Sequence, residues 1–371
     1  MPDPSPKADL LYFATNKEIQ DLIVQGPTRY PKEVLLDLTR ARGLFLSPEA
    51  SREELAAEVA LLPFDYETLS SLLERAPRHQ RAEKLTTESF SQVLKVEDIR
   101  KAWQGYANEN AGDEKVKIRQ TEDGRVIATV SYTELDPSKT ELLQRRQREA
   151  EIQFLPGATG TEVRMPFNDK AREILRDITA RINAQTDSPV ARQSIEVSHL
   201  ATAKQRTDFF LHLITGLPDF TFDDVTHLKV EVRIGSGKQK LSVSEAKAAK
   251  KNLTSTIENI AIKGASLLDS PEYKALTAKG FFITSISWTA RRPTSPYEIV
   301  EFVAAFEEGA EGTGFKYNVG NRYPYLPSRS ANAKTPQPIP KDEQTPYITQ
   351  LEQTARNALD QLDVQPDKLS A

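Results

Sequence analysis

Cysteine is absent from the 371 residues of this chain. Without a thiol, the protein has no disulfide framework, no thiolate metal site and no cysteine nucleophile. No apolar run approaches the ~18 residues that a membrane-spanning helix needs. The first residues, Met1 to Lys7, also lack the basic and then apolar pattern of a secretory signal peptide. These absences predict a cytoplasmic protein that does not enter membranes.

Histidine is scarce, with four residues in the whole chain. Three of them, His199, His212 and His227, lie close in sequence to the acidic residues between Glu196 and Glu231. Metal sites and catalytic bases are assembled from such groups, so a metal-dependent nuclease is one alternative. However, neither an HExxH pair nor a DxD triplet is present, and ion-pair networks gather the same residue types. We therefore expect no catalytic residue, no bound metal and no cofactor.

Neither sign of charge dominates, since 49 basic residues face 53 acidic ones and the net charge is -4. Residues 1–110 carry the whole excess, with 14 basic and 18 acidic residues, and the rest of the chain is balanced. A long-range positive field is therefore excluded. Any contact with nucleic acid must depend on local basic patches.

The spacing of apolar residues predicts an α+β fold in three regions. Residues 1–110 are expected to form a helical domain, and residues 111–320 a mixed, mainly antiparallel α+β domain. Residues 321–371 are expected to form a proline-rich linker and a tethered C-terminal helix. The predicted helices cover residues 16–24, 31–43, 51–63, 65–75, 96–107, 168–184, 202–217, 247–251 and 270–279. The predicted strands cover residues 116–120, 125–132, 151–155, 162–165, 194–197, 225–234, 256–263, 280–290 and 298–307.

The C-terminal helix is predicted over residues 345–362. Its apolar side chains lie on one stripe, formed by Ile348, Leu351, Ala355 and Leu359. Such a stripe either packs on its own protein or binds a protein partner at the end of a tether. Both possibilities stay open at the level of the sequence.

Residues 31–60 indicate a helix, a turn and a second helix, with basic residues at the junction. The pattern consists of Val34, Leu35 and Leu38, then the turn Arg42-Gly43-Leu44, then Arg52, Leu55 and Val59. Over about residues 29–62, this arrangement resembles the SAP motif, a short DNA-binding helical hairpin. The connection between Gly43 and Arg52 is longer than is usual in that family.

The resemblance implies that Arg42 and Arg52 contact phosphates. Arg40 lies beside them and joins the candidate contacts by charge alone. The alternative is an ordinary helical hairpin within a bundle, whose arginines only face solvent.

A second basic stretch runs from residue 229 to residue 251, where seven basic residues face two acidic ones. Its glycine-containing loop lacks the glycine and the Ser or Thr that a Walker A loop requires, which disfavours nucleotide hydrolysis. The phosphate contacts predicted here are Lys238, Lys240, Lys247 and Lys251.

Taken together, these features predict a non-enzymatic DNA-binding protein that holds the DNA backbone with little reading of bases. We expect it to be a subunit of a larger complex. One alternative is a protein–protein interaction adaptor that binds no nucleic acid, and a second is the metal-dependent nuclease.

Overall fold

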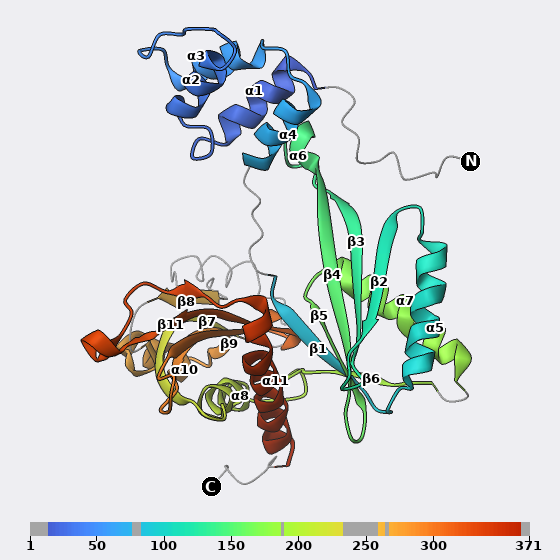
Figure 1. Cartoon of the computed structure of the whole chain (residues 1–371). Coiled ribbons are helices and arrows are strands. Elements are labelled where there is room, and N and C mark those ends of the chain that lie inside the picture. The colour runs from blue at the N-terminus through green and yellow to red at the C-terminus, as the bar shows by residue number, and fades with distance from the viewer. Residues whose placement is uncertain (1–13, 76–82, 187–188, 233–258, 264–266, 365–371) are drawn as a thin grey trace, which may run out of the picture. The chain divides into compact units, whose positions relative to one another are not determined.

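The computed structural model describes residues 14–75, 83–186, 189–232, 259–263 and 267–364 (Figure 1). Its contacts divide the chain into two compact units, each built from several segments. The first unit consists of Met1–Ala82, Lys95–Gln153 and Glu173–Asp187, and the second of Glu83–Leu94, Phe154–Arg172 and Ser188–Ala371. No helix in the described ranges is long and apolar enough to cross a membrane.

The first unit begins with a cluster of short helices. They are α1 (Asn16–Gln25), α2 (Lys32–Arg40), α3 (Arg52–Ala60) and α4 (Tyr66–Arg75). Local signals start and stop them: Ser51 and Glu54 form a capping box at the start of α3, and Gly43 follows α2 with a φ of 75°. The apolar faces of these helices share one core, which includes Ile23, Leu35 and Leu55.

The rest of the first unit combines helices with antiparallel strands. The elements are α5 (Val96–Glu109), β2 (Glu114–Gln120), β3 (Val126–Leu135), α6 (Glu141–Gln144), β4 (Arg145–Pro156) and α7 (Asp169–Gln185), of which β4 and α7 also contribute residues to the second unit. Strands β2 and β3 form the hairpin that the sequence predicted around Gly124. Helix α7 starts where Asn168 accepts a hydrogen bond from the Ala171 amide at 2.7 Å.

The second unit is built on an antiparallel sheet with the strand order β5-β1-β11-β10-β9-β7-β8. Its strands are β1 (Leu85–Phe90), β5 (Thr161–Pro166), β6 (Arg192–Ser194), β7 (Thr221–Glu231), β8 (Asn259–Lys263), β9 (Phe282–Arg291), β10 (Ile299–Glu308), β11 (Thr313–Tyr323), β12 (Tyr325–Leu326), β13 (Ala331–Asn332) and β14 (Gln337–Pro338). Its helices are α8 (Ala203–Thr215), α10 (Pro271–Ala278) and α11 (Lys341–Val364), with two 3-10 turns, η3 (Leu267–Asp269) and η4 (Pro327–Arg329).

Helices α8 and α11 lie on one face of this sheet (Figure 1). The inward side chains of the strands are large and apolar, and they meet the aromatic residues of α8 in a single core. The rings of Phe209 and Phe210 lie 5.3 Å apart between centroids, and both contact Phe306, at 5.5 and 5.7 Å. Phe209 also contacts Phe315 at 5.7 Å. The burial of these rings stabilises the second unit through the hydrophobic effect.

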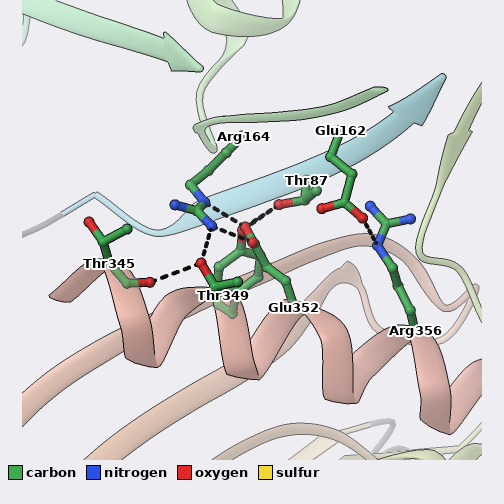
Figure 2. Close-up of polar contacts among 8 residues, drawn as sticks. Thr87, Glu162, Arg164, Thr345, Thr349, Glu352 and Arg356 are labelled. Atoms are coloured by element: carbon green, nitrogen blue, oxygen red, sulfur yellow. Dashed lines mark hydrogen bonds and ion pairs between the residues drawn. The ribbon is translucent and has the colours of Figure 1, made fainter. Parts of the chain in front are cut away.

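A buried polar cluster fixes α11 to the strands (Figure 2). The guanidinium of Arg164 donates to Glu352 through two nitrogens, at 2.7 and 2.5 Å, and to the hydroxyl of Thr349 at 3.0 Å. Glu352 also accepts hydrogen bonds from Thr87 and Tyr317. Because the three partners of Glu352 come from β5, β1 and β11, the cluster selects one register for α11 on the sheet.

The predicted fold class is confirmed: a helical N-terminal region is followed by a mixed, mainly antiparallel region and a C-terminal helix. The stripe of that helix packs on its own protein, since Ile348, Leu351 and Ala355 belong to the core of the second unit. The domain boundaries predicted at residues 110 and 320 stay a prediction. The two compact units are each built from several segments, and they do not show which stretch of the chain folds on its own.

Several segments differ from their predicted form: β11 begins at Thr313, where no strand was predicted, and the strand predicted at residues 194–197 lies at Arg192–Ser194. Residues 85–90 form strand β1 inside the region predicted to be helical. Within the predicted linker, β11 extends to Tyr323, β12 to β14 follow, and α11 already begins at Lys341. The helix predicted at residues 247–251 lies outside the described residues.

Candidate nucleic-acid interface

The hairpin that resembles the SAP motif is formed by α2 and α3. Arg40 makes an exposed ion pair with Asp37 at 3.2 Å, within the same helix. The guanidinium of Arg42 lies over the ring of Phe64, 4.9 Å from its centroid, in a cation–π contact. Both side chains therefore contact residues of this unit near the end of α2. Their contact with phosphate stays a prediction.

Arg52 points into the protein rather than toward solvent. Its guanidinium donates to the backbone carbonyls of Ile23, of Val24 at 3.3 Å and of Tyr30 at 3.1 Å, and it lies 3.7 Å from Glu53. The first two carbonyls belong to the last turn of α1, where backbone acceptors lack partners within the helix. Arg52 therefore links the start of α3 to the end of α1, and its donors are already used.

The second predicted patch falls mostly outside the described residues. Lys238, Lys240, Lys247 and Lys251 all lie there. The described part of this patch is Lys229 on β7, whose ammonium pairs with Glu231 at 2.6 Å.

Three of the histidines and acids of residues 196–231 form pairs with residues outside a common cluster. His199 lies 2.7 Å from Asp363, Asp208 pairs with Lys204 at 2.8 Å, and Asp223 pairs with Arg291 at 3.0 Å. Among the described residues, no three His, Asp or Glu side chains come together in a way that could hold a metal ion.

A third basic stretch was not among the predicted patches. Residues 312–341 contain five Lys or Arg residues and no Asp or Glu. The stretch covers β11 to β14, η4 and the first residue of α11. The predicted boundary at residue 320 divided it between two balanced regions, which concealed the excess of positive charge.

The cations of this stretch differ in their partners. Lys316 pairs with Glu307, and Arg322 pairs with Glu343 at 2.5 Å. Arg329 lies in η4, between β12 and β13, and Lys334 follows β13. Both are exposed, and neither makes an ion pair with any residue that the structure describes. Arg329 and Lys334 are therefore available to an anion from solution.

Two tyrosines from different loops meet beside this stretch. We call residues 292–298 and 324–333 the tyrosine loop pair. The rings of Tyr297 and Tyr325 lie 5.7 Å apart between centroids, tilted by 55°. Tyr297 is 49% exposed although it is a large aromatic residue, and its φ of 57° is in the left-handed region. A bulky residue rarely adopts this backbone conformation, so the surrounding structure holds it there.

A single side-chain amide holds the two loops together. The Nδ2 of Asn332 donates to the carbonyls of Tyr297 and Tyr323, at 2.9 Å each. Its Oδ1 accepts from Arg291 at 3.4 Å, which brings a guanidinium to the same place. Burial, together with the carboxylate of Glu301, raises the pKa of Tyr323. The arrangement combines the exposed ring of Tyr297 and the half-buried ring of Tyr325 with cations, and such groups meet the bases and phosphates of nucleic acids.

The comparisons with known proteins add no family. The scan of protein-family models gave no match to this chain. The search of curated proteins likewise found no significant similarity.

Proposed function

We propose that this chain is a non-enzymatic DNA-binding protein that holds the phosphate backbone through the cations of residues 312–341. The observation that carries the proposal is this stretch of 30 residues with five cations and no carboxylate, in a chain whose net charge is -4. Cations without internal partners gain most from a phosphate, because binding releases the counterions of the DNA. Arg329 and Lys334 meet that description in the part of the chain that the structure describes.

The test is DNA affinity measured by fluorescence anisotropy as a function of salt. The full chain is expected to bind a labelled DNA less tightly as salt rises from about 50 to about 200 mM. The charge-reversal variant Arg329→Glu with Lys334→Glu should lose at least about tenfold in affinity and show a shallower salt dependence. Both side chains are exposed, so the variant should fold normally.

The matched control is Arg100→Glu with Lys101→Glu, which makes the same change in net charge on the exposed surface of α5. It should keep the affinity of the wild type to within about threefold, because these two charges lie outside residues 312–341 and take no part in the proposed phosphate contact. Equal losses in the two variants would contradict a contact through residues 312–341.

The resemblance of residues 29–62 to the SAP motif supports a second place of phosphate contact. Because Arg52 serves the internal structure, the informative change is Arg40→Glu with Arg42→Glu. A loss of affinity additional to that of the first variant would assign the hairpin to DNA binding. Unchanged affinity would leave the hairpin as part of a helical bundle.

A second candidate function, a protein–protein interaction adaptor, is favoured by the surface of the same hairpin. Phe45 is 86% exposed, and Leu44, Leu61 and Tyr66 are exposed as well. Arg42 lies over Phe64 and thus connects the residues after α2 with those after α3. Large apolar side chains that stay exposed can serve as protein contacts. This candidate fits a subunit of a larger complex.

The adaptor is tested by comparing the proteins that co-purify with the chain and with its variant Phe45→Ser, Leu61→Ser. Partners lost from the variant would support it, provided that the free energy of unfolding stays within about 0.5 kcal/mol of wild type. An unchanged set of partners would speak against this surface.

A further inference from the structure

We infer that the tyrosine loop pair is a base-stacking site for single-stranded DNA. This inference rests on the proposed function, and it names the form of DNA that the site takes. It uses two groups that phosphate binding does not need, the rings of Tyr297 and Tyr325.

The first step is the exposure of the rings. Tyr325 covers part of Tyr297, while about half of the surface of Tyr297 remains open to solvent. An aromatic face in water is a binding surface for another flat aromatic group, and every nucleobase offers one. The tilted pair supplies such a face at the surface of the second unit.

The second step is the placement of charge around the rings. Arg329, which makes no ion pair with a described residue, lies in the turn between the strands that carry Tyr325 and Asn332. Arg291 donates to Asn332 as well, but its guanidinium is also paired with Asp223 at 3.0 Å. A nucleotide presents a base and a phosphate within one repeat of its backbone. The rings and the guanidinium groups therefore match the two parts of a nucleotide.

The third step separates single strands from duplex. In a duplex, both faces of each base are covered by the neighbouring pairs, so a surface tyrosine cannot stack on them without unstacking the helix. An unpaired strand can turn a base outward at low cost. Ring stacking therefore favours the single strand, whereas the cations act on both forms.

The fourth step is rigidity. Tyr297 is held at a φ of 57°, and the amide of Asn332 binds the carbonyl of Tyr297 itself. A fixed ring loses little conformational entropy when a base stacks on it. The strained backbone is thus consistent with a ring positioned for a ligand.

The experiment compares a labelled mixed-sequence strand of DNA with the duplex of the same sequence, using the full chain. We expect the wild type to bind the strand about tenfold or more tightly than the duplex. Tyr297→Ala should weaken strand binding by about tenfold and leave duplex binding unchanged. Tyr297→Phe keeps the aromatic face and should bind the strand like the wild type.

The outcomes distinguish this inference from the proposed function. Equal affinity for strand and duplex, with no effect of Tyr297→Ala, would overturn the stacking site and leave backbone binding intact. If the chain binds neither the single strand nor the duplex at low salt, the stacking site and the proposed DNA-binding function are both overturned. If Tyr297→Phe loses as much affinity as Tyr297→Ala, the hydroxyl and not the ring makes the contact, which also overturns stacking.

Discussion

Arg164 and Glu352 form a two-pronged ion pair in which both side chains are buried, with 4% and 3% of their surfaces exposed. Although burial disfavours its charge, hydrogen bonding to Glu352 raises the pKa of Arg164 above its ordinary value. Burial and the same carboxylate raise the pKa of Tyr317 well above its usual range. The pair is thus charged and closed off from solvent, so each partner depends on the other.

Glu352→Gln is predicted to lower the free energy of unfolding by about 3 to 5 kcal/mol, because it leaves the charge of Arg164 buried without a counter-charge. The measurement is chemical denaturation followed by circular dichroism. The double variant Arg164→Met with Glu352→Met removes both charges and should recover most of the loss. A double variant as unstable as the single one would show that packing, and not the unpaired charge, is responsible.

Arg52→Ala should lower the free energy of unfolding by about 1 to 3 kcal/mol, because the half-buried carbonyls of Ile23 and Tyr30 lose a charged donor. Arg40→Ala is the matched control, since its exposed pair with Asp37 contributes at most about 0.5 kcal/mol. Thermal and chemical denaturation measure both. If Arg52→Ala is as stable as its control, the guanidinium does not hold the end of α1.

The side chain of Tyr30 makes the free energy of unfolding depend on pH in the alkaline range. Burial raises its pKa from 10.0 to about 12, and its hydroxyl donates to the carbonyl of Leu72 at 2.6 Å. The unfolded chain releases this proton near pH 10, while the folded chain keeps it until about pH 12. The contribution is therefore complete below pH 10 and is lost as the pH rises from 10 to about 12.

The comparison of wild type with Tyr30→Phe isolates this contribution, because the lysines and other tyrosines titrate in both proteins. The free energy of unfolding of the wild type should fall more steeply over this range than that of the variant. At neutral pH the variant should be less stable by about 1 kcal/mol, since the Leu72 carbonyl loses a hydrogen bond. Parallel pH profiles would contradict the raised pKa.

The stability of variants at position 297 should depend on how readily each residue adopts a positive φ. Asn adopts the left-handed region more readily than tyrosine, and a β-branched residue adopts it least. Tyr297→Asn is therefore expected to be at least as stable as the wild type, and Tyr297→Val about 1 to 2 kcal/mol less stable than Tyr297→Asn. Denaturation curves of the three proteins measure these differences. Equal stability of the Asn and Val variants would mean that the loop changes its backbone conformation at position 297 and would contradict the prediction.

Local signals explain which elements the sequence predicted well. The helices predicted to start at residues 51 and 168 appear there, because Ser51 with Glu54 and Asn168 cap them through residues only three apart. The hairpin around Gly124 is equally local. Strand β1 has no comparable signal, since its partners in β5 and β11 are distant in sequence and decide its conformation.

The candidate site could be predicted in part only. Composition identifies the basic residues, but it does not tell that Arg52 turns inward to the carbonyls of α1. The charge excess of residues 312–341 is visible in the sequence once no boundary is drawn through it. The meeting of Tyr297 with Tyr325 depends on two loops joined by Asn332, which a single sequence does not indicate.

The interior position of β1 has a consequence for how the chain is made. The hydroxyl of Thr86 on β1 donates to the carbonyl of Phe315, 229 residues later in the sequence. At about 5 to 20 residues per second, a ribosome needs roughly 10 to 45 s to add that length. During this interval the backbone groups of β1 that will pair with β11 have no partner from that strand. Other chains pair most readily with a strand that has an open edge of this kind. We therefore expect the nascent chain to be more prone to aggregation before Phe315 is made than after the chain is complete.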